Sequence, residues 1–461
     1  MSTDRNASTK LILDELGMLW PGRVSTHERV CSQHANTLTS VATEPPDAVV
    51  WPQSTLEVQH IVRLAARNRV PVIPFGAGTS LEGHVNAPRG GIAIAFEKMS
   101  AILEIRPDDL DCSVEAGVPL TRLTAALRST GLFFPVDPGA DHATLGGMAA
   151  TRASGTTTVR YGSMRDNVIN LTAVMASGEI VRTARRARKS ASGYDLTRLL
   201  VGSEGTLGII TELTLKLYGV PEQILAFVAA FETVTEACRA ATEAIQAGLG
   251  IARCELLDAT QVRCVNAQSK LSLAERPTLF LEFHGSAAST DSDRAAFAAI
   301  AEGHGASAIQ SAANDVDRRR LWTARHDAFW AVKTAWPGKQ VLVTDVAVPL
   351  SKLADAVTET EKDILDHGLI APLVGHVGDG NFHAIVVFDP ANVQERKTID
   401  AFLERLVARA IAHDGTATGE HGIGQGKMRF LEAEHGAGVG VMRSIKAALD
   451  PLEILNPGKI F

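Results

Sequence analysis

Two short motifs in the second half of the chain contain residue types that can do chemistry. His376 and His383 flank a Gly-Asp-Gly-Asn turn in HVGDGNFH, and Glu420 stands next to His421 in GEHGIG. Two histidines and a carboxylate make a three-ligand set with an open position, which suits zinc or another divalent transition metal. The alternative is that these are ordinary core or surface residues. Residue chemistry alone leaves both interpretations open.

Three glycine-rich segments in the first half are the second feature. The first, PFGAGTSLEG at 74–83, directly follows a predicted strand and can expose several backbone N–H groups to a pyrophosphate. It is neither a dinucleotide fingerprint, because Leu81 stands where Gly is required, nor a P-loop, because no Gly-Lys-Ser/Thr follows. Taken alone, a plain strand-to-helix turn explains it equally well. Two further segments, at 138–162 and 202–210, also lie beside strand-like runs.

The elements that must position these motifs alternate between strands and helices. A strand at 48–52, a helix at 55–69 and a strand at 70–76 form a βαβ-like start. Strands at 370–378 and 382–389 predict a hairpin around the GDGN turn, which can bring both histidine rings to one side. The mixture predicts the α+β class. The other predicted strands lie at 91–96, 100–105, 112–117, 170–181, 208–219, 223–232, 278–285 and 341–349, and the other predicted helices at 119–131, 235–248, 355–368 and 399–415.

The composition narrows the function classes. Of 461 residues, 45% are hydrophobic and 21% charged, and the formal net charge is −7 without a basic block, so nucleic acid is not an expected partner. The five cysteines are scattered without a CxxC pair, which favours a reducing compartment over a disulfide framework or a cysteine zinc site. No apolar run of about 18 residues and no signal sequence are apparent. We therefore expect a cytoplasmic protein without a transmembrane segment, with peripheral binding at the inner membrane as a further option.

In order and spacing, the three glycine-rich segments resemble the FAD-binding domain of the vanillyl-alcohol oxidase / PCMH flavoprotein superfamily, over about residues 46–218. The resemblance implies a PCMH-type FAD-binding domain at 43–220, after an N-terminal helical segment at 1–42. No Cys or His stands in the first loop where covalently flavinylated relatives carry their linkage, although His84 lies just beyond it, so noncovalent FAD is expected. The residues that the resemblance assigns to FAD are Pro74, Gly76, Ala77, Gly78, Thr79, Ser80, Leu81, Pro138, Gly139, Thr144, Gly146, Gly147, Thr151, Ser154, Gly155, Gly202, Glu204, Gly205, Gly208, Ile209, Ile210 and Asn456.

The strings HVGDGNFH, GEHGIG and LNPGKIF are similar to the C-terminal domain of the FAD-dependent D-2-hydroxyacid dehydrogenases. The resemblance implies an α+β FAD-linked oxidase domain at 221–461 that binds substrate and metal, with the last residues returning to the flavin domain. In those relatives two histidines and a glutamate bind a divalent metal, and the adjacent histidine is the base. This carries His376, His383 and Glu420 over as ligands of zinc or manganese, and His421 as the base. Such a set suits the oxidation of a hydroxy acid, because a metal lowers the pKa of a hydroxyl and a histidine can accept its proton while hydride leaves for the flavin.

Arg325, in LWTARHD, matches the arginine that binds the substrate carboxylate in this family. A guanidinium can hold a carboxylate through two parallel hydrogen bonds. The alternative is a solvated helix charge, which describes the neighbouring Arg318, Arg319 and Arg320 better.

The expected substrate is a small monocarboxylate 2-hydroxy acid. Relatives acting on 2-hydroxyglutarate look as though they add polar residues for a distal carboxylate, whereas Phe329 and, approximately, Val343 stand there in this chain, and Ile385 continues the apolar lining. The strings most resemble the D-lactate dehydrogenase branch, which implies conversion of D-lactate to pyruvate. A dehydrogenase or oxidase for glycolate or a larger D-2-hydroxy acid is the alternative within enzymes.

Reoxidation of the flavin needs an external acceptor, because the chain carries no haem, iron–sulfur or nicotinamide motif. Cytochrome c, a quinone, an electron-transfer flavoprotein or oxygen would each serve. A homodimer is one option for the assembly. A flavoprotein that binds FAD without catalysis is the competing class.

Overall fold

The computed structural model describes residues 2–35 and 41–461, and it divides into two compact units. The chain leaves the first unit between Val220 and Pro221, where the sequence predicts a domain boundary. Two features were not predicted: residues 155–161 belong to the second unit, and the return to the first unit begins as early as Glu420. Of the predicted N-terminal segment, residues 1 and 36–40 lie outside the described residues. The first unit comprises Met1–Ser154, Gly162–Val220 and Glu420–Phe461, and the second Gly155–Tyr161 and Pro221–Gly419.

The first unit contains a small, mostly parallel sheet with the order β1-β2-β4-β3. Between β2 (Ala48–Val50) and β3 (Val72–Phe75), helix α3 (Thr55–Asn68) buries an apolar stripe at 3.6-residue spacing. Its N-cap Ser54 accepts a hydrogen bond from the Glu57 amide, which fixes the start of the helix. The predicted βαβ-like start is confirmed, although β4 (Ile92–Ala95) is inserted between its two strands.

The first unit also contains a larger sheet, which is antiparallel and has the order β5-β6-β10-β8-β9. The segment 170–181, predicted as one strand, is instead a hairpin of β8 (Val168–Val174) and β9 (Ile180–Arg182). The Gly178 amide donates to the Met175 carbonyl at 2.8 Å and closes the turn, and Gly178 has a φ of +77°. The predicted strand ran through this turn, although the polar pair Ser177-Gly178, a turn signal, interrupts the apolar residues there.

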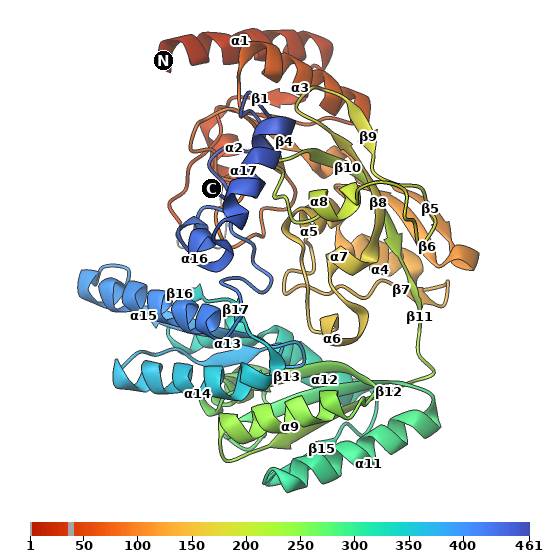
Figure 1. The fold of residues 1–461 in the computed structure, drawn as a ribbon, viewed down its shortest axis with the longest axis vertical. Helices are drawn as coiled ribbons and strands as arrows, with labels where there is room; N and C mark the ends of the chain where they lie inside the picture. The colour runs from red at the N-terminus through yellow and green to blue at the C-terminus, as the bar shows by residue number, and fades with distance from the viewer. Residues whose placement is uncertain (1, 36–40) are drawn as a thin grey trace. The chain divides into compact units, whose positions relative to one another are not determined.

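The C-terminal segment of the chain adds to the edge of the small sheet. Leu455 forms a parallel bridge with Val72, and the Asn456 amide donates to the Val72 carbonyl at 2.9 Å. Figure 1 shows the last helices, α16 and α17, in the same unit as the N-terminal strands. The remaining elements of this unit are α1 (Ser2–Leu19), β1 (Val24–Ser25), α2 (Glu28–Gln33), η1 (Phe96–Lys98), β5 (Ile102–Arg106), η2 (Pro107–Asp109), β6 (Asp111–Glu115), α4 (Leu120–Leu127), β7 (Leu132–Phe133), α5 (Leu145–Thr151), α7 (Met164–Asn167), α8 (Leu196–Leu200), β10 (Ile209–Lys216), β11 (Tyr218–Gly219), η3 (Met428–Phe430), α16 (Leu431–His435) and α17 (Gly438–Leu449).

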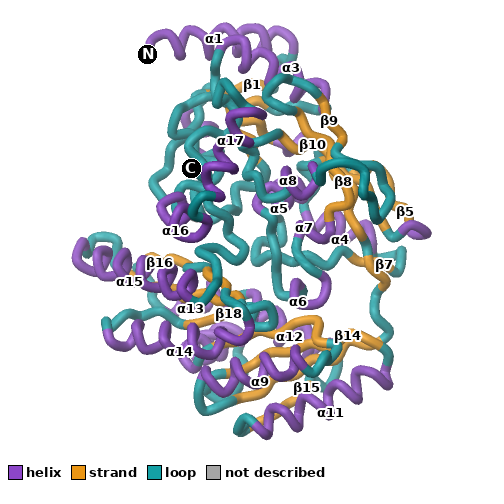
Figure 2. The backbone as a smooth tube through the Cα atoms, viewed as in Figure 1, coloured by secondary structure: helices purple, strands orange, loops and turns teal. Residues whose placement is uncertain are grey.

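The second unit is built on an eight-stranded sheet with the order β15-β12-β14-β13-β18-β19-β16, and β17 pairs with β19. Helices α9, α11 and α14 cover one face (Figures 1 and 2), whereas α10, α12 and α13 cover the other. The bounds are α6 (Thr158–Tyr161), β12 (Gln223–Ala230), α9 (Val234–Gln246), β13 (Ile251–Leu257), α10 (Ala259–Ser269), β14 (Thr278–Gly285), α11 (Ala287–Gly303), β15 (Ala308–Ser311), α12 (Asp315–His326), α13 (Ala328–Ala335), β16 (Gln340–Val343), β17 (Val346–Ala347), α14 (Leu350–Asp366), β18 (Leu373–Gly375), β19 (Asn381–Phe388) and α15 (Val393–Ala412).

Successive side chains of a strand point to opposite faces of the sheet, so the core residues of the second unit divide between two faces. Phe283 of β14 stacks on Phe297 of α11, on one face. Phe280, three residues earlier, packs edge-on against Trp322 of α12, on the other. The second face is the one that carries charged residues into the interior. The two units together confirm the predicted α+β class.

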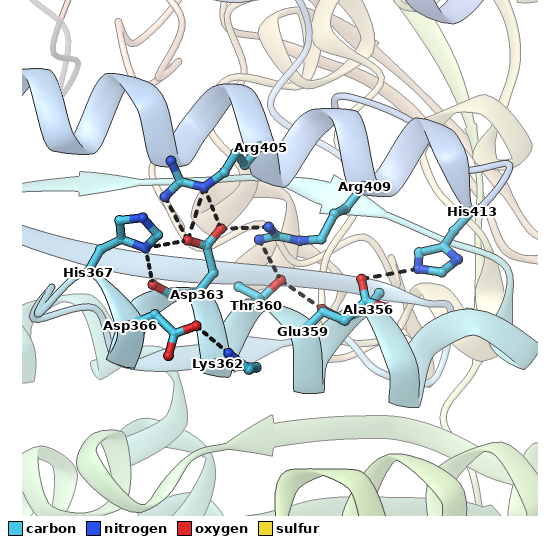
Figure 3. A network of polar contacts seen from close by, with 10 residues as sticks. All are labelled: Ala356, Glu359, Thr360, Lys362, Asp363, Asp366, His367, Arg405, Arg409 and His413. Carbon is cyan, nitrogen blue, oxygen red and sulfur yellow. Dashed lines mark hydrogen bonds and ion pairs between the residues drawn. The ribbon is translucent and has the colours of Figure 1, made fainter.

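A charged network joins α14 to α15 in the second unit (Figure 3). The Asp363 carboxylate, 7% exposed, accepts from Arg405 Nη2 at 2.6 Å and from Arg409 Nη1 at 2.6 Å. Burial by itself would raise the pKa of Asp363, but the hydrogen bonds from Arg405 and Arg409 outweigh burial and hold that pKa below its usual value. The ionised carboxylate therefore stabilises the packing of the two helices.

We expect Asp363→Asn to lower the free energy of unfolding of the second unit by about 1–2 kcal/mol at pH 7, because both arginines are partly solvated. A lowered pKa in the folded state gives stability that is present above the ordinary aspartate pKa of about 3.9 and is lost as pH falls through the folded-state pKa. The difference between parent and variant should thus be constant from pH 7 to 5 and shrink below about pH 4. Urea unfolding over that range measures it, and a difference that grew on acidification would contradict the assignment.

Among the described residues, no helix is long and apolar enough to cross a membrane. All five cysteines are buried and unpaired with one another. Burial raises the pKa of the Cys112 and Cys238 thiols to about 12, so these two are inert core residues at neutral pH.

Candidate active site

The two histidines of HVGDGNFH lie together in the second unit. Strands β18 and β19 form the predicted hairpin, in which Val374 is opposite His383. His376 directly follows the last residue of β18, Gly375, and its ring centroid is 5.6 Å from that of His383, at an interplanar angle of 87°. The turn requires glycine at Gly380, which has a φ of +87° and whose missing Cβ would collide with the Val348 carbonyl.

The Nδ1 atom of each histidine is bound to an oxygen that can only accept a hydrogen bond. His383 Nδ1 donates to the Thr344 carbonyl at 2.8 Å, and His376 Nδ1 donates to the Glu255 carboxylate at 2.8 Å. With the proton on Nδ1, the lone pair of a neutral imidazole is on Nε2. Nε2 is therefore the nitrogen that both histidines would present to a metal, and the donor pair fits the predicted ion.

Glu255, on β13, is a central residue that the sequence analysis missed. It is fully buried, and besides His376 it contacts Arg325, whose Nη2 lies 2.5 Å from the Glu255 Oε2. Burial alone would raise the pKa of Glu255, but Arg325 and His376 outweigh burial and hold it below the usual value. The available signal was a glutamate inside the apolar run IARCELL, since glutamate is rarely buried without a partner.

Arg325 lies in the last turn of α12 and is 8% exposed, whereas Arg319 and Arg320 are exposed. The helix-charge interpretation therefore does not describe Arg325. Among the described residues its buried Nε has no hydrogen-bond partner. An unsatisfied buried guanidinium nitrogen is costly, and this one is a donor that could still take an acceptor.

Apolar residues share the sheet face that carries His383. Ile385 follows two residues later on β19, and Val343 of β16 is its cross-strand partner. Phe329 lies in the first turn of α13, four residues past Arg325, with its ring edge-on to Trp330. Of the residues predicted to line the substrate site, Ile385 thus shares β19 with His383, and Phe329 lies on the helix that follows Arg325.

The chain segment that precedes Glu420 is fixed at the start of β19. Asp345 accepts from Asn381 Nδ2 at 2.8 Å and from Thr418 Oγ1 at 2.7 Å. Gly419 packs against the Asn381 amide so closely that a Cβ would collide with it. The predicted strand 341–349 is broken into β16 and β17 at Thr344 and Asp345, whose side chains accept hydrogen bonds from the Ala384 amide and from Asn381 Nδ2 of β19.

In the first unit, Glu420 and His421 begin a loop that is bonded to the flavin segments. Ser154 Oγ donates to the Glu420 carboxylate at 2.8 Å, and His421 Nδ1 lies 3.9 Å from the Glu82 carboxylate. The Glu82 carbonyl accepts from the Gln425 amide at 2.7 Å. The loop that carries the predicted base is thereby held against the first glycine-rich segment.

Glu204, predicted to bind FAD, has its carboxylate engaged by the same loop. The amides of Ile423 and Gly424 donate to it at 2.7 and 2.8 Å, and His84 Nε2 is 3.3 Å away. Burial would raise the pKa of Glu204, but the facing His84 and the two amides hold it below its usual value. Its side chain thus positions the loop that carries His421. Its backbone amide donates to the Ala150 carbonyl at 2.9 Å, and its carbonyl accepts from Asn456 Nδ2 at 2.7 Å. His84, just beyond the first glycine-rich segment, thus faces the Glu204 carboxylate.

The structure brings the three glycine-rich segments together. Gly76 lies against Thr144, which caps α5 by accepting from the Gly147 amide, and a Cβ at residue 76 would collide with that hydroxyl. Gly205 lies against Pro74 in the same way, and the Gly202 amide donates to Ala149 at 2.9 Å. Pro138 and Gly139 precede α5, Gly208 directly precedes β10, and Ile209 and Ile210 begin that strand. Gly155 alone of this set falls in the second unit.

Three buried polar atoms in these segments test whether a polar cofactor fits. Ser80 Oγ, Ser203 Oγ and Asn456 Oδ1 have no hydrogen-bond partner among the described residues. Ser80 and Asn456 are on the predicted list, whereas Ser203 was missed although it stands inside the GSEG string. Buried groups of this kind are normally satisfied, so unpartnered polar atoms at these three positions fit a ligand rich in acceptors and donors, as FAD is.

Comparison with known proteins agrees with this geometry. Residues 220–460 match the family described as FAD linked oxidases, C-terminal domain, and residues 46–184 match the FAD binding domain. The chain belongs to the FAD-linked oxidases. Membership confirms the predicted family and the predicted pairing of an FAD-binding domain with an FAD-linked oxidase C-terminal domain.

Individual relatives of this FAD-linked oxidase cover most of its length. A probable mitochondrial D-lactate dehydrogenase of Danio rerio is 47% identical over 95% of this chain and 88% of that protein. The mitochondrial D-lactate dehydrogenase (cytochrome) of Arabidopsis thaliana is 43% identical over 90% and 73%. The solved structure of p-cresol methylhydroxylase with substrate bound has a TM-score of 0.82 at 16% identity, over 100% of this chain and 97% of that one, which shows the shared fold.

Proposed function

We propose that this FAD-linked oxidase converts a D-2-hydroxy acid, D-lactate first, to its 2-oxo acid. The observation that carries the proposal is the shared carboxylate: Glu255 contacts both Arg325, the predicted carboxylate binder, and His376, a predicted metal ligand. The group that would hold the substrate's carboxylate and the group that would hold a metal are therefore immediate neighbours. The D-lactate dehydrogenase names of its relatives support the same substrate.

In the proposed mechanism Arg325 binds the substrate carboxylate and sets the orientation of C2. His376 and His383 offer their Nε2 atoms, and Glu420 its carboxylate, to a divalent zinc or manganese ion. Such an ion supplies Lewis acidity, which lowers the pKa of a hydroxyl. His421, whose Nδ1 lies 3.9 Å from the Glu82 carboxylate, accepts the hydroxyl proton. Noncovalent FAD supplies the acceptor for the hydride from C2.

The apolar face favours a monocarboxylate. A second carboxylate beside Val343, Ile385 and Phe329 would be buried without a cationic partner, at a cost of several kcal/mol. As the reduced flavin needs an external acceptor, the cytochrome named for the Arabidopsis thaliana relative supports a cytochrome here. A quinone or an electron-transfer flavoprotein remains an alternative. Both relatives named above are described as mitochondrial, so the cytoplasmic location stays a prediction.

Anaerobic addition of D-lactate to the purified protein is expected to bleach the flavin absorbance near 450 nm. L-lactate is the matched control, because the hydrogen and the hydroxyl on its C2 are exchanged in position relative to D-lactate. Glycolate and D-2-hydroxyglutarate complete the panel. Bleaching by 2-hydroxyglutarate in preference to D-lactate would refute the monocarboxylate proposal, and no bleaching by any 2-hydroxy acid would favour a non-catalytic flavoprotein.

A further inference from the structure

Glu255 is the most deeply buried charged group in contact with the proposed site, and no step of the mechanism uses it. We propose that Glu255 is a positioning residue that orients both the substrate arginine and a metal-binding histidine. The inference rests on the proposed function for the roles of Arg325 and His376. Beyond that function, a single carboxylate sets the orientation of both the Arg325 guanidinium and the His376 ring.

The location of Glu255 follows from the pleat of β13. Leu257, two residues after Glu255, lies on the same face of β13 and packs in the apolar core with Phe280 and Trp322. This face of β13 is thus one on which apolar side chains are expected. A carboxylate there carries a desolvation cost that only close partners offset. Glu255 has two such partners, from α12 and from the segment after β18, at 2.5 and 2.8 Å.

The contact with Arg325 fixes the guanidinium plane. Arginine has five N–H donors in one rigid plane, so holding Nη2 restrains all of them. The buried Nε then remains in a constant direction for an external carboxylate. Without Glu255, the side chain keeps its charge but loses its fixed orientation.

The contact with His376 fixes the tautomer and the ring rotation. A carboxylate on Nδ1–H directs Nε2 outward and raises its basicity, and loss of such a partner in metalloproteins commonly lowers metal affinity 10–100-fold. His383 has a backbone carbonyl in the corresponding position. A substitution at Glu255 therefore changes the Nδ1 partner of His376 and leaves the Thr344 carbonyl on His383 in place.

The neighbouring strand provides a matched control. Glu282 of β14 is also buried, and it contacts His284 of the same strand, with Nε2 at 2.8 Å, and Arg318 of α12, with Nη1 at 3.4 Å. Neither of these partners is a predicted site residue. Glu282→Gln thus reproduces the loss of a buried carboxylate with histidine and arginine partners, without touching Arg325 or His376.

The experiment compares Glu255→Gln, Glu255→Asp and Glu282→Gln with the parent as FAD-loaded proteins. Manganese alone is titrated into each metal-stripped protein, and KM and kcat for D-lactate are measured separately. For Glu255→Gln we expect manganese affinity to fall 10–100-fold and KM to rise roughly tenfold or more, with the flavin spectrum unchanged. Glu255→Asp, which keeps the charge, should lie between this variant and the parent. Glu282→Gln should keep both constants within about twofold.

Three results would overturn the inference. One is parental manganese affinity and KM in Glu255→Gln; another is equal losses in Glu282→Gln. The third is a lower KM in Glu255→Gln, because it would show that Glu255 offsets the charge of Arg325 instead of positioning it. If Glu255→Gln does not fold, Glu255→Asp decides by the same two constants. Failure of the parent itself to bind manganese or to oxidise any 2-hydroxy acid would refute the proposed function, which is a distinct outcome.

Discussion

His421→Ala is expected to slow flavin reduction by D-lactate by roughly 10²–10⁴-fold, the range typical of a lost general base, while FAD and metal stay bound. The physical reason is that an alcohol proton must leave as hydride departs, and alanine cannot accept it. The residual rate should rise at high pH, where hydroxide substitutes for the imidazole. Anaerobic stopped-flow absorbance at saturating D-lactate measures the effect.

The matched control is His435→Ala, which removes a partly exposed histidine of α16 in the same unit whose ion-pair partner is its own neighbour Glu434. It should reduce at the parental rate. Added metal should not rescue His421→Ala, whereas it should partly rescue Glu420→Gln, because the latter would lose a ligand and not the base. Parental flavin reduction in His421→Ala, with FAD and metal at full occupancy, would place the base elsewhere.

Metal removal is expected to have a still larger effect on flavin reduction. Chelation, or His383→Ala, should abolish flavin reduction by D-lactate but leave the flavin spectrum and its reduction by dithionite unchanged. The reason for this separation is that the histidine pair belongs to the second unit, whereas the buried unsatisfied atoms of the flavin segments belong to the first. Metal analysis, followed by re-addition of Zn²⁺ or Mn²⁺ to the chelated parent, measures the recovery.

His367→Ala is the control for this test, since it removes an exposed histidine of α14 in the second unit that bonds to Asp363. It should keep metal and activity. A metal-free preparation that oxidised D-lactate at the parental rate would contradict the metal proposal, whatever the behaviour of the His383 variant.

The sequence by itself determined the motifs and most of the local elements. Strand alternation and the GDGN turn predicted the β18–β19 hairpin, because both signals are carried by adjacent residues. The order of the three glycine-rich segments identified the family before any contact was known. Errors arose where a short polar interruption changed the path of the chain, as at Gly178 in the β8–β9 hairpin and at Asp345 between β16 and β17.

Only the tertiary structure decided which charged groups share the interior. Glu255 and His376 are 121 residues apart in the chain, and their contact depends on how β13 aligns with β18 and how α12 packs on that face. The engagement of Glu204 by the 423–424 amides likewise spans 219 and 220 residues. Periodicity reports the environment along one element, so it indicates that a residue is buried but not which partner it meets. Long-range pairing is set by the packing of whole elements, and that is why the residues holding the site in place were visible only in the fold.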